Sequence, residues 1–151
     1  MAAQYAVDTN VLLRLSHRSH LQHQLLSECM LRFADRNVEL CYTSQNLGEF
    51  WSVSTRPVDR NGFGLSIPET GRRFETVVRN MTLLSETEDV FATWLKLMKT
   101  HEVRGTQVHD AHLAAVLEVH GVTQLLTFNG GDFKRFPQIR AVHPQDVVNQ
   151  P

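Results

Sequence analysis

Short apolar runs alternate along this chain with longer segments whose apolar residues recur at helical spacing. The short runs cover residues 5–7, 38–43, 81–85, 124–128 and 139–144. Each has the length of a short buried strand. Because strands that alternate with helices usually pair in parallel through right-handed crossovers, the sequence predicts an α/β fold with a central, mainly parallel sheet.

Capping signals and apolar periodicity predict the helices. One buried helix face is expected from residues that recur at every fourth position, namely Leu21, Leu25, Cys29 and Phe33. Three serines are expected to cap later helices, because each stands where a helical pattern begins: Ser44, Ser66 and Ser85. A further helix is expected from about Asp110 to a C-cap at Gly121. Residues 58–68 hold two glycines and a proline and are expected to form a candidate binding loop.

Charge and composition restrict the class of protein. The 151 residues carry 15 Lys+Arg against 16 Asp+Glu, a formal net charge of -1. A protein that coats nucleic acid is strongly basic, so any contact with nucleic acid must come from a local patch or a metal ion. Cys29 and Cys41 lack metal-ligand or redox spacing, and we expect both to be reduced core residues. The sequence has neither a signal-peptide pattern nor a long apolar run, which predicts a cytoplasmic protein without a membrane segment.

Four acidic residues fall where the predicted elements meet. Asp8, Glu49 and Asp132 each follow the end of an expected strand, and Asp110 begins a helix. Each has an ordinary explanation when taken singly: a turn residue, a helix-surface acid or a first-turn acid. Ligand sites of parallel sheets lie beyond the carboxyl ends of the strands. The joint occurrence of the four acids at that one edge therefore indicates a site.

The chemistry of such a group indicates a metal ion. Carboxylates that converge on one cleft repel each other, and their pKa values rise. A hard divalent cation such as Mg²⁺ or Mn²⁺ relieves that repulsion and binds oxygen ligands and phosphates. Such a cation can activate water and neutralise a phosphodiester in its transition state. The acids thus predict phosphodiester hydrolysis.

Four segments, VDTNVLLRL, SQNLGEFWSV, VHDAHLAAVLEVHGVTQLLTFNGGDF and FPQIRAVHP, follow one another along the chain. In these segments the chain resembles the PIN-domain nucleases, and most closely the VapC-like toxins of prokaryotic toxin–antitoxin pairs. The resemblance implies a three-layer α/β/α sandwich in which residues 1–151 form a single domain. It also implies a Mg²⁺- or Mn²⁺-dependent endoribonuclease that binds a small inhibitory antitoxin and forms a homodimer.

The resemblance also implies roles for individual residues. The catalytic and metal-binding set would be Asp8, Glu49, Asp110 and Asp132, with Glu49 a ligand through water or the general base. The polar residues that support this set would be Thr9, Asn10 and Thr127. Asn129 stands where many family members carry an acid. Asp132, three residues later, would supply the fourth carboxylate instead, and Asn129 would contact the substrate. Arg14 and Arg104 are the expected phosphate contacts, and His109 and His112 are expected to be ordinary polar helix residues.

Two other enzyme classes require residues that this chain lacks, and two other functions stay open. An aspartyl phosphotransferase of the haloacid-dehalogenase type needs a second aspartate where Asn10 stands, and an aspartic protease needs Asp-Thr-Gly, which the chain lacks. A catalytically silent PIN-like module that binds RNA or protein stays open, although all four acids are present. A stand-alone RNA-processing nuclease also stays open.

Overall fold

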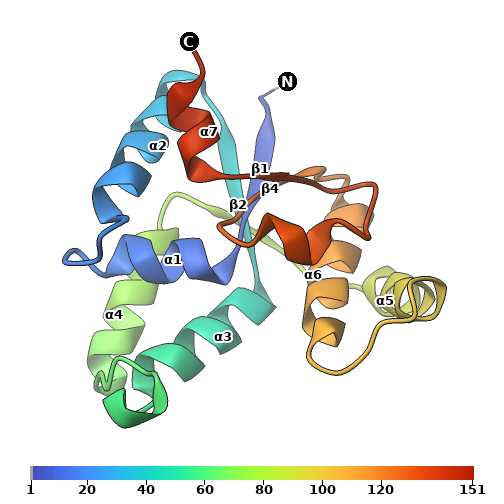
Figure 1. Cartoon of the computed structure of the whole chain (residues 1–151), viewed down its shortest axis with the longest axis horizontal. Helices are drawn as coiled ribbons and strands as arrows, with labels where there is room; N and C mark the ends of the chain where they lie inside the picture. Colours follow the sequence, from blue (N-terminus) through green and yellow to red (C-terminus); the bar gives the residue numbers. More distant parts are fainter. Residues whose placement is uncertain (1) are drawn as a thin grey trace.

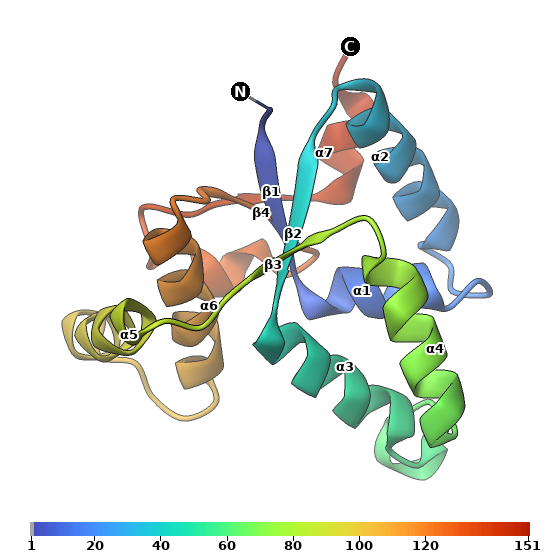
Figure 2. The same ribbon diagram turned by 180° about the vertical axis from the view of Figure 1, so that it is seen from behind.

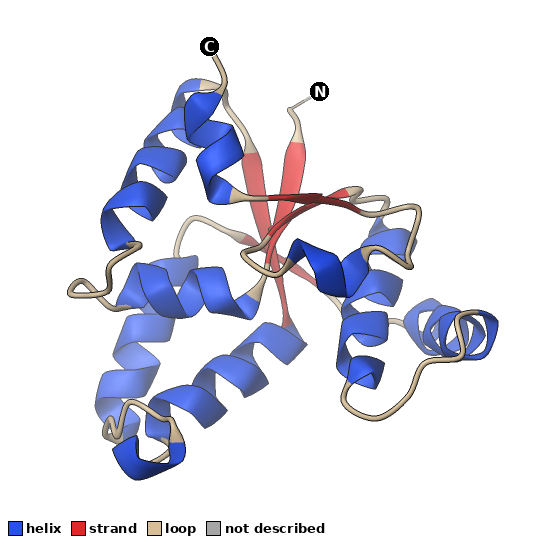
Figure 3. Cartoon of the chain, in the orientation of Figure 1, coloured by secondary structure: helices blue, strands red, loops and turns tan. Residues whose placement is uncertain are grey.

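The computed structural model describes residues 2–151, and its centre is one parallel sheet (Figures 1 and 3). The five strands lie in the order β3-β2-β1-β4-β5, and every described pairing is parallel. Their bounds are β1 Gln4–Val7, β2 Glu39–Thr43, β3 Thr82–Leu84, β4 Gln124–Leu126 and β5 Arg140–Val142. The chain begins in the middle of the sheet, builds one side through β2 and β3, and then returns to add β4 and β5 on the other.

Within residues 2–151, seven α-helices flank the sheet. Their bounds are α1 Thr9–Ser16, α2 His23–Asp35, α3 Ser44–Thr55, α4 Ile67–Val78, α5 Glu88–Thr100, α6 Gln107–His120 and α7 Pro144–Asn149. Two single turns of 3-10 helix complete the described structure, Val58–Arg60 and Gly130–Phe133. None of the helices in residues 2–151 combines the length and the apolar character needed to span a membrane.

Alternating strand residues divide the core into two parts. Ala6 packs in one buried cluster with residues of α5 and α6, whereas its neighbours Tyr5 and Val7 pack in another with residues of α1, α2, α3, α4 and α7. Successive side chains of a strand point to opposite faces, so the sheet has a helical layer on each side. Figure 2 shows α5 and α6 on one side of the strands, with the other helices opposite. The predicted α/β/α sandwich is confirmed.

The expected stripe on the second helix is wrong in its first half. Leu21 precedes α2 and is 97% exposed, and Leu25 is only half-buried. The buried residues are Leu26, Cys29 and Phe33. A strict spacing of four advances 400° per step, so it drifts around a helix with 3.6 residues per turn. Spacings of three and four, as in the observed set, keep to one face.

Three predicted helix starts also differ from the structure. Thr43 rather than Ser44 caps α3, because its hydroxyl accepts from the Asn46 N–H while the Asn46 side chain accepts from the Thr43 N–H. Thr87 rather than Ser85 precedes α5. Helix α6 begins at Gln107, three residues before Asp110. Ser66 does cap α4, as predicted. At α3 two neighbouring residues offer a hydroxyl, and that of Thr43 makes the cap, whereas α5 and α6 begin without a hydrogen bond from a capping side chain.

Candidate active site

Four carboxylates come from four different elements at the carboxyl edge of the sheet. Asp8 follows β1 directly and is the N-cap of α1, and Glu49 lies on α3, which starts immediately after β2. Asp110 lies in the first turn of α6, and Asp132 lies in the 3-10 turn that follows β4. We call these four residues the acidic cluster. Parallel strands bring their carboxyl ends to one edge, which explains why residues more than a hundred positions apart face each other.

The Asp8 carboxylate is held by three donors. Its Oδ1 accepts from the backbone N–H of Thr9 at 2.8 Å. Its Oδ2 accepts from the Thr127 hydroxyl at 2.7 Å and from the Asn10 side-chain amide at 3.3 Å. Asn10 also accepts from the backbone N–H of Phe128 at 3.4 Å. The donors come from both strand ends that border Asp8, so the carboxylate is fixed before any ligand binds.

Thr9 supports the site in a different way from Thr127. Its hydroxyl turns away from Asp8 and accepts from the side chain of Asn46 at 3.0 Å. Asn46 is 1% exposed and also caps α3 together with Thr43. This buried link joins the start of α1 to the start of α3 and thereby sets the position of Asp8 relative to Glu49.

Burial and neighbouring negative charge raise the pKa values of three of the four acids in the cluster. Burial, followed by the negative charge of Asp132, raises the pKa of Asp8 against the hydrogen bonds that lower it. Burial also raises the pKa of Asp110 to about 6, with further contributions from Asp132, Asp8 and Glu49 in that order. Glu49 is exposed as a whole residue, but desolvation of its carboxylate and the charge of Asp8 still raise its pKa. The charges of Asp8, Glu49 and Asp132 therefore make ionisation of other acids in the cluster less favourable.

The donor set fits a hard divalent cation. It consists of carboxylate oxygens. A cation bound among them would offset the repulsion between their negative charges and so stabilise their ionised forms. As the side chains are placed, no group of three or more acidic, histidine or cysteine residues among residues 2–151 could hold a metal ion. Mg²⁺ commonly takes only one or two protein carboxylates directly and keeps several waters. A fully enclosed site of the kind that holds structural zinc does not fit these residues.

A chain of polar side chains that was not predicted from the sequence leads from Glu49 to the outside of the site. Gln45 lies one turn before Glu49 on α3 and donates from Nε2 to Glu49 Oε1 at 2.7 Å and to the carbonyl of His109 at 3.0 Å. The Gln45 carbonyl contacts Nδ1 of His112, whose Nε2 lies 2.6 Å from Glu86. His112 also packs edge-on against Trp94.

This chain corrects the expectation that His112 is an ordinary polar residue of its helix. It is half-buried and connects Glu86 through Gln45 to a member of the acidic cluster. The spacing of Gln45 and Glu49, four residues apart on a helix, is a signal that the sequence did contain. The contact between Gln45 and His112 joins residues 67 positions apart, and no local pattern indicates it.

The three residues expected to contact substrate lie in different surroundings. Arg14 is half-buried on α1, with its guanidinium 4.3 Å from the centre of the Phe128 ring. Its Nη1 is buried and has no acceptor within residues 2–151. Arg104 is exposed in the segment before α6, and Asn129 is exposed just before the 3-10 turn that carries Asp132. Arg14 is the one of the three whose guanidinium packs on an aromatic ring.

Comparisons with known proteins agree with this geometry. A family model described as PIN domain matches residues 5–139. The fold is similar to that of VapBC2 from Rickettsia felis, with a TM-score of 0.70 and 15% identity over 93% of this chain and 98% of that chain. It is also similar to VapBC-1 from nontypeable Haemophilus influenzae, with a TM-score of 0.68 and 17% identity over 94% and 98% of the two chains. VapC20 from Mycobacterium tuberculosis, described as a sarcin-ricin loop cleaving toxin, gives a TM-score of 0.62 and 16% identity over 85% and 92%. A comparison with curated protein sequences returns no significant match.

Proposed function

The chain belongs to the PIN-domain family, and from that premise we propose that it is a metal-dependent endoribonuclease that hydrolyses RNA phosphodiester bonds at the acidic cluster. The observation that carries the proposal is that Asp8, Glu49 and Asp110 all have raised pKa values, first through burial and then through the negative charges of other members of the acidic cluster. Carboxylates that are buried close to other negative charges are unfavourable in a protein without a cation. Perturbed carboxylates at the strand ends of a parallel sheet are a mark of function rather than of stability.

The cation would be Mg²⁺ or Mn²⁺, held mainly by Asp8 and Asp110 and completed by Glu49 and Asp132. When bound, it supplies positive charge that neutralises the phosphodiester and makes water a better nucleophile. Asp8 suits the role of principal ligand because three hydrogen bonds fix its carboxylate. Thr9, Asn10 and Thr127 would hold the ligands in place from behind.

The chain's own residues supply the rest of the chemistry. Glu49 would accept a proton from the attacking water, since a carboxylate with a raised pKa is a stronger base than a free one. Arg14 would contact a non-bridging phosphate oxygen, because its buried Nη1 lacks a protein acceptor and its guanidinium is held on Phe128. Asn129 and Arg104 are exposed near the cluster and would contact the RNA at its rim.

The proposal is tested by incubating the purified protein with one structured and one unstructured RNA. We expect cleavage in Mg²⁺ or Mn²⁺ and none in EDTA, with activity restored when the cation is added back. Cleavage that continues unchanged in EDTA would show that the acidic cluster does not work through a divalent cation.

We expect that replacing Gln45 with Leu lowers the cleavage rate by about 10- to 100-fold, as is usual when an outer partner of a metal ligand is lost. The change removes the donor to Glu49 and the acceptor for His112 while the helix is kept. Gln22→Leu, which alters a glutamine outside the cluster, is the matched control. A Gln45→Leu protein with the wild-type rate would show that Glu49 needs no support from this chain of side chains.

The toxin role is the more specific part of the proposal. It is supported by the shared fold with proteins of VapBC pairs and with a toxin that cleaves the sarcin-ricin loop. In that role the protein would act in the cytoplasm as a homodimer and would be inhibited by a small antitoxin. Expression alone should arrest growth, and co-expression with the protein encoded by a neighbouring small gene should relieve the arrest. Harmless expression of an enzyme that is active in vitro would favour a stand-alone RNA-processing nuclease.

A further inference from the structure

A second charged region lies at the far end of α1 from the acidic cluster. A pocket of about 680 Å³ opens between the end of α1, the turn before α2 and one face of α4. We call it the basic pocket, and its polar lining includes Ser16, His17, Arg18, His23, Arg72 and Arg73. Glu69 is the one acidic residue of this lining. Three arginines against one glutamate give a positive pocket on a chain whose formal net charge is -1.

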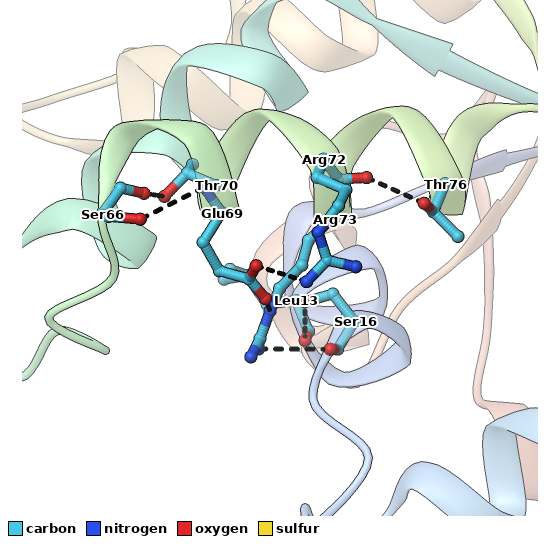
Figure 4. A network of polar contacts seen from close by, with 8 residues as sticks. All are labelled: Leu13, Ser16, Ser66, Glu69, Thr70, Arg72, Arg73 and Thr76. Carbon is cyan, nitrogen blue, oxygen red and sulfur yellow. Dashed lines mark hydrogen bonds and ion pairs between the residues drawn. The ribbon is translucent and has the colours of Figure 1, made fainter.

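The walls of the basic pocket are fixed by contacts between α1 and α4 (Figure 4). Arg73 donates from Nε to Glu69 at 2.7 Å and from Nη1 to the carbonyl of Ser16 at 3.3 Å. Arg72 also pairs with Glu69, but its side chain is 70% exposed and free to contact a ligand. The Glu69 carboxylate thus orients both arginines without cancelling their combined charge.

The histidines of the turn before α2 add polar groups that lack an acidic partner. His17 lines the pocket, and its buried Nδ1 has no hydrogen-bond partner within residues 2–151. His23 contacts the carbonyl of Arg14 through Nδ1 at 3.1 Å. Burial and the neighbouring charges of Arg14, His17 and His23 lower the pKa of His20. The unpartnered Nδ1 of His17 and the three arginines leave the lining of the pocket with more hydrogen-bond donors than acidic partners.

The position of the basic pocket along α1 indicates which kind of anion it would bind. Helix α1 has eight residues and is therefore about 12 Å long, with Asp8 at its start and His17 at its end. Arg14 lies between them, against Phe128. This distance corresponds to roughly three or four stacked nucleotides at about 3.4 Å each. An RNA strand that lies along α1 would meet the acidic cluster, Arg14 and the basic pocket in turn.

We propose that the basic pocket binds a backbone phosphate of the RNA a few nucleotides from the bond that is cut. This inference rests on the proposed function, since it assigns the polyanion to the substrate. Arg18 and Arg72 are the expected contacts because both are exposed in the lining, whereas Arg73 is engaged in holding α1 to α4. The pocket would add affinity for longer RNA and take no part in the chemical step.

The test compares two double variants that remove the same charge. Arg18→Gln/Arg72→Gln neutralises the pocket, and Arg79→Gln/Arg140→Gln neutralises two exposed arginines elsewhere. Binding of an unstructured RNA of about 20 nucleotides is measured by fluorescence anisotropy at several salt concentrations, in EDTA and with Asp8→Asn added to every protein. We expect the pocket variant to bind on the order of tenfold more weakly and its salt slope to fall by about 0.7 for each lost phosphate contact.

The proposal is overturned if the pocket variant and the control variant bind RNA equally well with equal salt slopes. That result would also be obtained if the pocket instead takes an acidic segment of a protein partner. Thermal unfolding of both variants checks that they are folded, and the less disruptive Arg72→Lys should retain most of the binding. Failure of the proposed function is seen separately, as the absence of RNA cleavage by the wild-type protein in Mg²⁺ or Mn²⁺.

Discussion

Replacing Asp8 with Asn is expected to reduce the rate of RNA cleavage at least about 10³-fold. This loss is larger than is usual when one hydrogen-bond donor to a transition state is removed, because the substitution removes a charged metal ligand. The substitution keeps the size of the side chain and removes its charge. The new amide oxygen can still accept from the backbone N–H of Thr9, and the Thr127 hydroxyl can turn to accept from the new amide N–H. We therefore expect a folded protein that is inactive, measured as the rate of cleavage of a labelled RNA.

The control for Asp8→Asn is Asp59→Asn, which removes one exposed carboxylate far along the chain from the cluster. It should cleave at the wild-type rate. If Asp8→Asn also cleaved at that rate, the activity would come from a contaminant or from another site. A protein that binds RNA but cuts none in either form would be the catalytically silent binding module.

Replacing Asp110 with Asn is expected to separate activity from stability. Cleavage should be lost, whereas the metal-free protein should become more stable at pH 7. The pKa of Asp110 is raised from 3.8 to about 6 in the folded protein. The folded state therefore holds this proton more tightly than the unfolded chain does. The stabilising contribution of protonated Asp110 is complete below about pH 4 and is lost as the pH rises through about 6.

Asparagine cannot ionise, so the Asp110→Asn protein does not lose this contribution to the free energy of unfolding as the pH rises. The full pKa shift would correspond to about 3 kcal/mol in the free energy of unfolding. Asp110 is only partly buried, and the start of α6 favours its negative charge. We therefore expect Asp110→Asn to be more stable than the wild type by about 1 kcal/mol at pH 7. Urea unfolding in EDTA at pH 7 and at pH 3.5 measures it. The gain should vanish at the lower pH. An Asp110→Asn protein that is less stable than wild type at pH 7 would contradict the account of repulsion in the acidic cluster.

The sheet could be predicted from the sequence because it depends on local patterns, and the same patterns place Asp8 and Asp132 after strands. Strand β1 ends at Val7, directly before Asp8, and β4 ends at Leu126, shortly before the turn Gly130–Phe133 that holds Asp132. Parallel pairing then brings those strand ends to one edge without any knowledge of individual contacts. Helix starts were predicted less well: Thr43 rather than its neighbour Ser44 caps α3, and α5 begins after Thr87 without a side-chain cap.

The parts that the sequence did not predict depend on contacts between distant elements. His112 contacts Gln45 because α6 packs near the start of α3, and the periodicity of neither helix indicates that contact. The basic pocket likewise joins the end of α1 to α4, and Arg73 reaches Ser16 across 57 residues of sequence. Arg18 and Arg72 are ordinary surface charges until the fold places them in one lining.

Calorimetric titration of Mn²⁺ into the metal-free protein tests most directly whether the four carboxylates act as one cation site. We predict saturable binding to the wild type and binding that is weaker by about tenfold or more in Asp8→Asn and Asp110→Asn, with smaller losses in Glu49→Gln and Asp132→Asn. Asp59→Asn should bind Mn²⁺ as the wild type does. The account would be contradicted by a wild-type protein that binds no Mn²⁺, or by binding that all four substitutions in the acidic cluster leave unchanged.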